Sequence, residues 1–419
     1  MLKLVTPKGV ERKDFELSLD EIAREGARRM LVQALNLEVE EYINQHQNEV
    51  DDNGHRLVVR NGKSKERNIT TGAGTVSVQA PRINDQREGK TFNSFILPKY
   101  LRKSPKVESL LPILYLKGLS TSNFQSALGQ FLGEGVSGLS PASIVKLKKI
   151  WEDEFELWSK RKITKNYIYI WADGVNVEIR LGEDDKLCLL VIIGVTEEGK
   201  KELIAVESGY RESTESWLAV MRSLVARGMK APLVACGDGA LGFWSALRAC
   251  DGFKSTKEQR CWVHKIANVL DKLPKRLQPK AKELLHEMMR ADTLENAEKD
   301  LKNFENLYSE KYPKAVECLT KSWKQLTTYF NFPASHWVHL RTTNPIESAF
   351  ATVKLRTRVT KGAGSKKSAE AMAFKLLLEC EKKWKVINGA KEIKNLLEGL
   401  EYKDGVVVAT QKHHEVAAG

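Results

Sequence analysis

Two aspartates each follow a short apolar stretch and each precede a glycine. Asp173 follows residues 166–172, where aromatic and aliphatic side chains alternate, and Asp238 follows the apolar stretch 232–236. Such patterns predict buried strands, and an acid at the end of one is costly unless it is paired or binds a cation. We therefore predict that the two strand ends lie side by side and share metal. The alternative is that Asp-Gly marks two unrelated β-turns.

A third acid, Glu347, lies in a segment with helical spacing. Lys354 and Arg358 follow it on the same side of the expected helix, where they would face DNA phosphates held near a metal. The apolar side of that helix is formed by Ile346, Phe350 and Val353. The alternative for Glu347 is purely structural: with Asn344 as N-cap and Pro345 as the first helical residue, the glutamate would close a capping box.

Cys261 and His264 have the spacing of half a zinc site. The other half would be His336 and His339, but the long separation is not that of a zinc finger, so we regard zinc as the weaker interpretation. We expect His264 close to the acidic site, in contact with DNA or orienting a carboxylate. The alternative is a buried structural pair.

The 419 residues carry a net charge of +13, and 42% of them are hydrophobic. Residues 56–106 hold twelve Lys or Arg against three acids, and such a concentration points to a polyanionic partner, most often nucleic acid. A solvated basic face is the alternative. Six scattered cysteines without a Cys-x-x-Cys pair indicate a reducing cytoplasm, and neither a secretory signal nor a membrane-spanning stretch is recognisable.

The first 162 residues read as DNA-binding elements. A helix is predicted over 19–45 with Ser18 as its N-cap, followed by a basic β-hairpin unit within 51–106. Three helices, at 107–117, 121–132 and 140–158, are compatible with a helix-turn-helix unit or with an ordinary three-helix module. The basic side chains that we expect on DNA are Arg60, Lys63, Lys65, Lys146, Lys148 and Lys149.

The following segment changes to mixed α/β character. Strands are predicted at 166–173, 175–182, 186–195 and 202–207, then a helix at 213–227, a strand ending near Asp238 and a helix at 243–249. This order is that of a ribonuclease-H-like fold. Helices follow in an insertion, and the last two are expected at 345–360 and 368–386. The predicted domains are 1–50, 51–106, 107–162, a catalytic domain made of 163–261 and 341–402, a helical insertion at 262–340, and a tail at 403–419.

Four motifs occur together in one order. They are Trp-Ala-Asp-Gly-Val around Asp173, Gly-Asp-Gly-Ala around Asp238, Gln-Arg-Cys-Trp-Val-His-Lys at 259–265, and Thr-Thr-Asn-Pro-Ile-Glu-Ser at 342–348. Over roughly residues 20–390 the chain closely resembles the Mutator-type transposases of bacterial insertion sequences. The resemblance implies a ribonuclease-H-like catalytic domain, a helical insertion before the glutamate, and a triad of Asp173, Asp238 and Glu347 that binds two Mg²⁺ or Mn²⁺ ions. It implies that Cys261, His264 and Asn344 lie around the triad.

The resulting expectation is an enzyme that binds the ends of an insertion sequence, hydrolyses a phosphodiester and transfers the 3′-hydroxyl to another DNA strand. The resemblance further implies a circular intermediate. Two element ends must be brought together, so we expect at least a homodimer, located in the bacterial cytoplasm and on the nucleoid when bound to DNA. The alternatives are a non-catalytic DNA-binding regulator and a metal-dependent nuclease without strand transfer.

Overall fold

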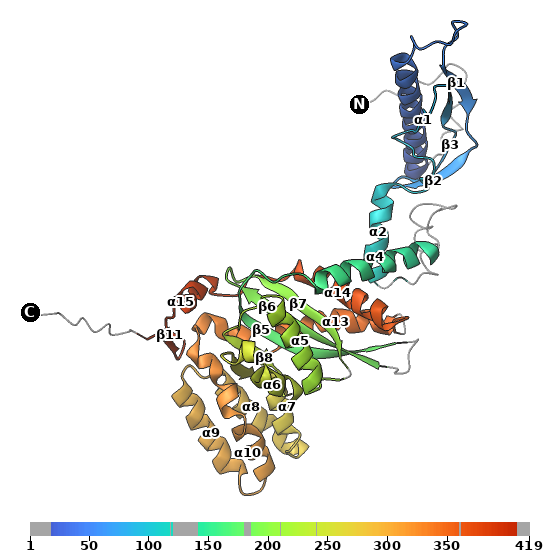
Figure 1. Ribbon diagram of the computed structural model, residues 1–419. Coiled ribbons are helices and arrows are strands. Elements are labelled where there is room, and N and C mark those ends of the chain that lie inside the picture. The colour runs from blue at the N-terminus through green and yellow to red at the C-terminus, as the bar shows by residue number, and fades with distance from the viewer. Residues whose placement is uncertain are drawn as a thin grey trace, which may run out of the picture. The chain divides into compact units, whose positions relative to one another are not determined.

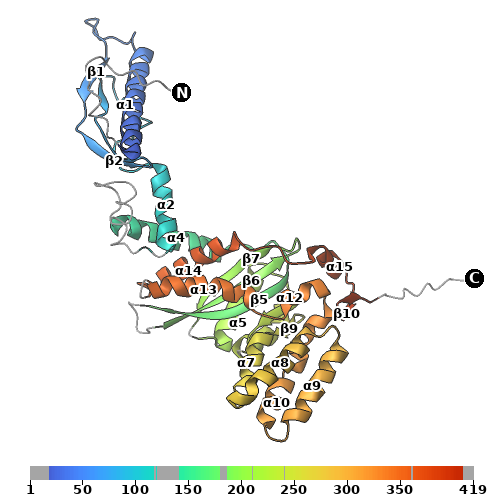
Figure 2. The same ribbon diagram turned by 180° about the vertical axis from the view of Figure 1, so that it is seen from behind.

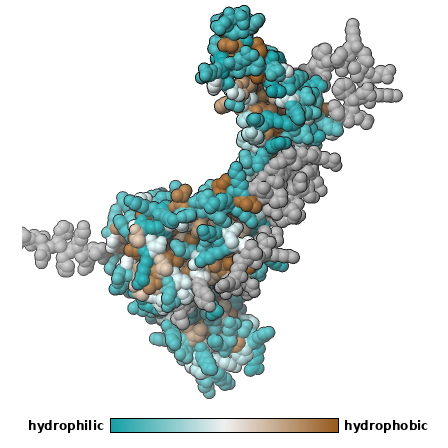
Figure 3. Space-filling model, turned by 45° about the vertical axis from the view of Figure 1, so that its right-hand side comes forward, coloured by the Kyte–Doolittle hydropathy of each residue, from teal (hydrophilic) through white to brown (hydrophobic). Residues whose placement is uncertain are grey.

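The computed structural model describes residues 18–117, 119, 141–179, 186–209, 211–239, 241–359 and 362–408. The chain divides into two compact units, Met1–Leu147 and Lys148–Gly419 (Figures 1 and 2). Hydrophilic side chains cover most of the described surface in view in Figure 3, with apolar residues scattered among them. Within the described residues, no helix is both long enough and apolar enough to cross a bilayer.

The first unit is organised around the long helix α1 (Leu19–Gln45). Its predicted start is confirmed, because the Glu21 side chain accepts from the backbone of Ser18 at 2.7 Å while the Ser18 hydroxyl accepts from the backbone of Glu21. These contacts satisfy two backbone N–H groups that a helix start leaves unpaired. One face of α1 then packs on a small apolar core, which is formed by Leu35, Ile69, Val76, Val78 and Leu97.

Two antiparallel strand pairs accompany α1. β2 (Arg67–Thr71) and β3 (Gly74–Val78) form a hairpin, and β1 (Val58–Lys63) pairs with the later strand β4 (Pro81–Asp85). The predicted β unit is therefore present, with two strand pairs rather than a single hairpin.

Two helices follow these strands. α2 (Pro105–Leu116) starts after its N-cap Ser104, and α4 (Pro141–Ser159) crosses the boundary between the two units. The middle helix predicted at 121–132 lies outside the described residues, so the helix-turn-helix unit stays a prediction.

A five-stranded mixed sheet forms the centre of the second unit, in the order β7-β6-β5-β8-β9. Its strands are β5 (Tyr167–Glu178), β6 (Lys186–Thr196), β7 (Lys201–Gly209), β8 (Val234–Gly237) and β9 (Lys257–Arg260). β5, β6 and β7 are antiparallel neighbours, whereas β8 runs parallel to both β5 and β9. The sequence predicted this meander and the return of β8, but not β9.

The predicted break between strands at Gly174 is wrong. β5 continues through Asp173 and Gly174 as one strand of 12 residues, because its partner β6 pairs with it residue by residue up to Glu178. Asp173 therefore lies within a strand. It is nevertheless the first residue beyond the parallel pairing with β8, which ends where Ala172 faces Gly237.

Helices cover the sheet on both faces (Figures 1 and 2). α5 (Thr214–Ala226) and α6 (Leu241–Ala249) bury aromatic and aliphatic side chains such as Trp217 and Phe243 against the strands. α13 (Asn344–Val359) contacts β5, and α14 (Lys366–Glu381) contacts β7. Burial of apolar surface is the main favourable term in folding, and here it fixes β5 and β8, which Asp173 and Asp238 follow at the end of their pairing.

Helices fill the segment between β9 and α13, where the sequence predicts a helical insertion. Its α-helices are α7 (Trp262–Leu270), α8 (Gln278–Arg290), α9 (Leu294–Tyr308), α10 (Pro313–Thr320), α11 (Trp323–Leu326) and α12 (Trp337–Leu340). The described chain ends with α15 (Ile393–Leu397) and the short pair β10 (Tyr402–Lys403) and β11 (Val406–Val407). Single 3₁₀ turns connect several elements, at Asp251–Phe253, Lys275–Leu277, Thr328–Asn331, Ala334–His336 and Ala390–Glu392.

Candidate active site

Asp173 and Asp238 lie next to each other at the junction of β5 and β8. Each directly follows one member of the last parallel pair, Ala172 and Gly237. Their carboxylate oxygens lie within 4.8 Å of each other. Parallel strands bring the residues that follow their last pairing to the same edge of the sheet, so the proximity predicted from two Asp-Gly motifs is confirmed.

A third carboxylate, which the sequence did not predict, completes this group. Glu212 lies between β7 and α5, and its carboxylate oxygen is within 4.8 Å of those of Asp173 and Asp238. Gly174 makes room for it: a Cβ atom at that position would lie 2.4 Å from Glu212 Oε1. A glycine inside a buried strand often marks a close approach of another group. That was the only available signal, and it does not name the partner.

The group carries unfavourable negative charge. Burial raises the pKa of Asp173 to about 7, and the charge of Asp238 adds to the shift, although the backbone N–H of Gly174 donates to Asp173 Oδ1 at 2.8 Å and opposes it. Burial and then Asp238 raise the pKa of Glu212 as well. Three crowded, half-buried carboxylates are an oxygen donor set of the kind that Mg²⁺ and Mn²⁺ prefer. The residues present therefore fit the divalent metal that the sequence predicts.

Glu347 belongs to a neighbouring group. One ligand atom each of Cys261, His264 and Glu347 lies within 4.8 Å of the others, and His264 Nδ1 is 3.8 Å from Glu347 Oε1. The structure thus does not place the Glu347 carboxylate within the same 4.8 Å as the two aspartates. His264 links the groups electrostatically, because the charges of both Glu347 and Asp238 favour its protonated form.

The surroundings of His264 favour its protonated form. A hydrogen bond with Cys261 is the largest cause that raises the pKa of His264 to about 9, ahead of the nearby carboxylates and against the effect of burial. Burial alone would raise the pKa of the Cys261 thiol, but hydrogen bonds with His264 and Thr343 outweigh it and lower that pKa. The pair is therefore polar and charged, unlike a histidine and cysteine packed in an apolar core.

The capping box considered for Glu347 is not formed as expected. α13 begins at Asn344, one residue earlier than that interpretation required, and the Glu347 side chain accepts a hydrogen bond from the Thr343 hydroxyl. The N–H of Glu347 donates to the carbonyl of Thr343 at 3.1 Å, which makes Thr343 the residue before the helix. The carboxylate is thus held by a neighbouring side chain rather than by the backbone of Asn344.

The two faces predicted for α13 are present. Ile346, Phe350 and Val353 are buried, whereas Lys354 and Arg358 are exposed on the side of Glu347. In the first unit, Lys63, Lys65 and Lys146 are exposed, whereas Lys148, the first residue of the second unit, is half-buried. Lys149 forms an ion pair with Asp153 at 2.9 Å, and Arg60 donates to Asn36 and lies 3.9 Å from Glu40. Arg60 and Lys149 therefore already have partners within the protein.

The zinc interpretation is not supported by the histidines that it needs. Nδ1 of His336 lies 2.8 Å from the Tyr169 hydroxyl and Nε2 lies 3.0 Å from the carbonyl of Gly389. Since a carbonyl only accepts, Nε2 carries the proton and Nδ1 accepts from the tyrosine. His339 Nε2 accepts from the backbone of Asn388 at 2.9 Å. Neither histidine joins the group formed by Cys261 and His264.

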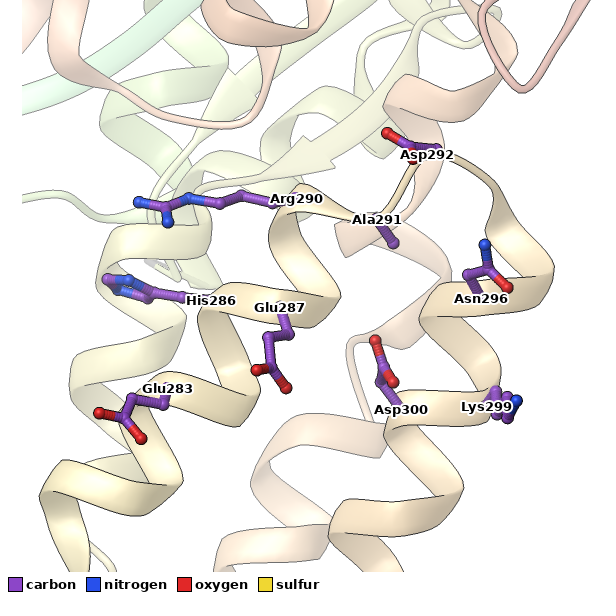
Figure 4. Close-up of a pocket in the computed structure, with 9 residues that line it drawn as sticks. All are labelled: Glu283, His286, Glu287, Arg290, Ala291, Asp292, Asn296, Lys299 and Asp300. Carbon is purple, nitrogen blue, oxygen red and sulfur yellow. The ribbon is translucent and has the colours of Figure 1, made fainter.

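A cavity of about 610 Å³ lies elsewhere, between α8 and α9 of the insertion (Figure 4). Four acidic side chains and two basic ones line it, so acidic groups predominate. None of the acids described above lines it. Its lining residues are Glu283, His286, Glu287, Arg290, Ala291, Asp292, Asn296, Lys299 and Asp300.

Comparison with known proteins identifies the family. The family model described as "Transposase, Mutator family" matches residues 4–386. The transposase for insertion sequence element IS6120 of Mycolicibacterium smegmatis is 48% identical over 67% of this chain and 86% of its own length. The transposase for IST2 of Acidithiobacillus ferrooxidans is 47% identical over 67% of this chain and 95% of its own. A more distant similarity, 24% identity over 90% of this chain and 92% of the relative, is to the transposase for ISRM5 of Rhizobium meliloti. The chain belongs to the Mutator family of transposases.

Proposed function

We propose that this transposase cleaves phosphodiester bonds at insertion-sequence ends and transfers the resulting 3′-hydroxyl to another DNA strand. The observation that carries the proposal is the adjacency of Asp173 and Asp238 where the parallel pairing of β5 and β8 ends, with Glu347 in a separate group that His264 links to Asp238 electrostatically. The strand order and the helices on both faces support a ribonuclease-H-like core.

Asp173, Asp238 and Glu347 would hold two divalent cations, Mg²⁺ or Mn²⁺, with Glu212 contributing a further carboxylate. When bound, the ions activate the attacking oxygen and offset the charge that develops on the phosphate. The protein side chains then have to orient the DNA and to prevent the phosphate from binding in unproductive positions. Lys354 and Arg358 would hold the phosphates next to the bond that is cut, and His264 would add a positive charge between the carboxylates.

Arg358→Ala is expected to slow single-turnover cleavage roughly ten- to hundredfold, and Lys354→Ala by the same factor or less. A charge-assisted hydrogen bond contributes about 1.5–3 kcal/mol, and each 1.36 kcal/mol corresponds to about tenfold in rate. Lysine should matter less because it makes one contact with a phosphate, whereas arginine can donate two parallel hydrogen bonds. Lys394→Ala, in the exposed helix α15, is the matched control and should cleave like the parent. Parent-like cleavage by Arg358→Ala and Lys354→Ala at both low and moderate salt would place these cations on a solvated outer face.

The basic first unit is proposed to bind the element ends. Replacing exposed Lys63 and Lys65 together by alanine should weaken binding and reduce the slope of log affinity against log salt by about two, since each phosphate contact contributes roughly one. Gel-shift titrations at several salt concentrations measure this slope. Lys311→Ala with Lys314→Ala removes the same charge from an exposed part of the insertion and serves as control. An equal change in slope for both pairs would indicate a diffuse effect of net charge.

Strand transfer separates the proposal from its two alternatives. A regulator that only binds DNA would not cut in the presence of Mg²⁺ or Mn²⁺. A nuclease would cut but would not join an element end, already cut to expose its 3′-hydroxyl, to target DNA. We further propose that the chain acts in the bacterial cytoplasm, on the nucleoid when DNA-bound, and at least as a homodimer, because two ends must be held at once.

A further inference from the structure

We propose that Thr343 is a positioning residue whose hydroxyl holds the Glu347 carboxylate in place for cleavage, with Cys261 and His264 holding Thr343 in turn. The inference rests on the proposed function, in which Glu347 acts in the cleavage reaction. Thr343 lies within the motif at 342–348, but none of the sequence patterns assigned it a role.

The contacts around Thr343 are unusually concentrated for one small side chain. Thr343 is completely buried. Its hydroxyl donates to Glu347 Oε1, lies 3.3 Å from Cys261 Sγ and lies 3.4 Å from His264 Nδ1. Its backbone N–H also points at the sulfur, at 3.4 Å. One side chain from the first turn of α13 and two from the start of α7 thus meet at one oxygen.

The proton count assigns a direction to this network. A threonine hydroxyl has one proton to donate, whereas an ionised carboxylate can only accept. The contact with Glu347 is the shortest of the three, so the proton lies there. The oxygen of the hydroxyl is then free to accept from protonated His264, while Cys261 Sγ accepts from the backbone N–H of Thr343 at 3.4 Å. His264 therefore orients the hydroxyl, Cys261 holds the backbone that carries it, and the hydroxyl holds the carboxylate.

The same network ties Glu347 to the strand that carries Asp238. The N–H of Cys261 donates to the carbonyl of Gly237, the residue before Asp238, at 2.8 Å. The N–H of Trp262 donates to the carbonyl of Arg341 at 2.9 Å, so α7 is attached at its start both to β8 and to the segment before α13. A short path of hydrogen bonds thus runs from β8 through Cys261 and Thr343 to Glu347.

Ordinary helix capping does not account for the Thr343 side chain. An N-cap hydroxyl accepts from a backbone N–H of the first turn, whereas this hydroxyl donates to a carboxylate. The adjacent Thr342 makes the local backbone contact instead: its hydroxyl accepts from the N–H of Asn344 at 3.4 Å. Two neighbouring threonines, both largely buried, therefore differ in their tasks. Thr342 supplies a matched control for the structural cost of losing a hydroxyl.

The test compares Thr343→Val, Thr343→Ser and Thr342→Val in the full chain. Valine keeps the branched shape and removes the hydroxyl, while serine keeps the hydroxyl. We measure single-turnover cleavage of element-end DNA across a range of Mn²⁺ concentrations, together with end binding and the melting temperature. Loss of a group that orients a metal ligand typically costs 10–100-fold in metal affinity or activity. Thr343→Val should show that loss with unchanged end binding, Thr343→Ser should stay within about threefold of the parent, and Thr342→Val should lose stability alone.

Three outcomes would overturn the inference. Parent-like cleavage by Thr343→Val would mean that Glu347 needs no such support. Equal losses in the valine and serine variants would show that the site tolerates no change in the side chain and that the hydroxyl has no special role. Equal losses in Thr343→Val and Thr342→Val would indicate a general weakening of the start of α13. Glu347→Gln, assayed in parallel, distinguishes this failure from that of the proposed function. If Glu347→Gln is inactive while Thr343→Val is normal, only the positioning role is wrong.

Discussion

Asp173→Asn, Asp238→Asn and Glu347→Gln are each expected to abolish DNA cleavage while leaving binding of element ends largely intact. Each change removes one negative charge and hardly alters the shape of the side chain. Metal ions contribute several kcal/mol to catalysis of this kind, and a loss of about 4 kcal/mol corresponds to roughly a thousandfold in rate. Residual cleavage should therefore be at least about a thousandfold slower than in the parent.

Single-turnover cleavage and gel-shift binding measured on the same preparations separate the two effects. Asp251→Asn and Glu215→Gln, which remove exposed acids from the same unit, are the controls and should cleave normally. Glu347 lies in a separate group with Cys261 and His264, so its proposed role in cleavage is the one that these measurements test most severely. Normal cleavage by Glu347→Gln would show that this carboxylate serves the start of α13 only.

Glu212→Gln is expected to weaken Mn²⁺ binding about 10–100-fold and, without metal, to stabilise the protein. Removing one of three crowded carboxylates takes away a ligand and also relieves repulsion. The folded-state pKa of Asp173, about 7, lies above its ordinary value of 3.8, so the folded state binds more protons than the unfolded one. Stability of the metal-free parent should thus fall as the pH rises between about 4 and 7, and it should fall less in Glu212→Gln.

Metal titration followed by electron paramagnetic resonance of free Mn²⁺ gives the affinity. Melting temperatures of the parent and of Glu212→Gln, compared at pH 5 and pH 8 in the presence of a chelator, show how much repulsion among the carboxylates destabilises the protein. Glu215→Gln, three residues further along and exposed, is the matched control for both measurements. Unchanged Mn²⁺ affinity in Glu212→Gln would make Glu212 a mere neighbour of the site, and it would leave the roles proposed for Asp173 and Asp238 untouched.

The adjacency of Asp173 and Asp238 was predictable because it depends on local signals. A buried strand can be recognised from its own residues, and two parallel strands must end at the same edge of their sheet. The start of α1 was predictable for the same reason, since Ser18 and Glu21 satisfy each other's backbone groups within one turn. In these cases the contacts either join residues that are close in sequence or follow from the direction of the strands alone.

The errors and omissions involve contacts between distant segments. Gly174 was interpreted as a turn because glycine often ends strands. In the structure β5 continues through it, and its missing side chain leaves room for the Glu212 carboxylate. Glu212 itself stands between a strand and a helix without any motif, and only the packing of α5 on the sheet brings it to Asp173. The role proposed for Thr343 could not be predicted for the same reason, because it depends on a contact with Cys261, which lies in a distant part of the sequence.

The most direct test of the account is to incubate the full chain with DNA that contains its own element ends, with Mg²⁺ or Mn²⁺ or with a chelator, and to map the nicks at nucleotide resolution. We expect cuts at the element boundary that require the metal, joining of a pre-cut 3′ end to a second DNA strand, and loss of both reactions in Asp173→Asn. Cuts that persist in Asp173→Asn, or the absence of any metal-dependent cut by a protein that binds the ends, would contradict it.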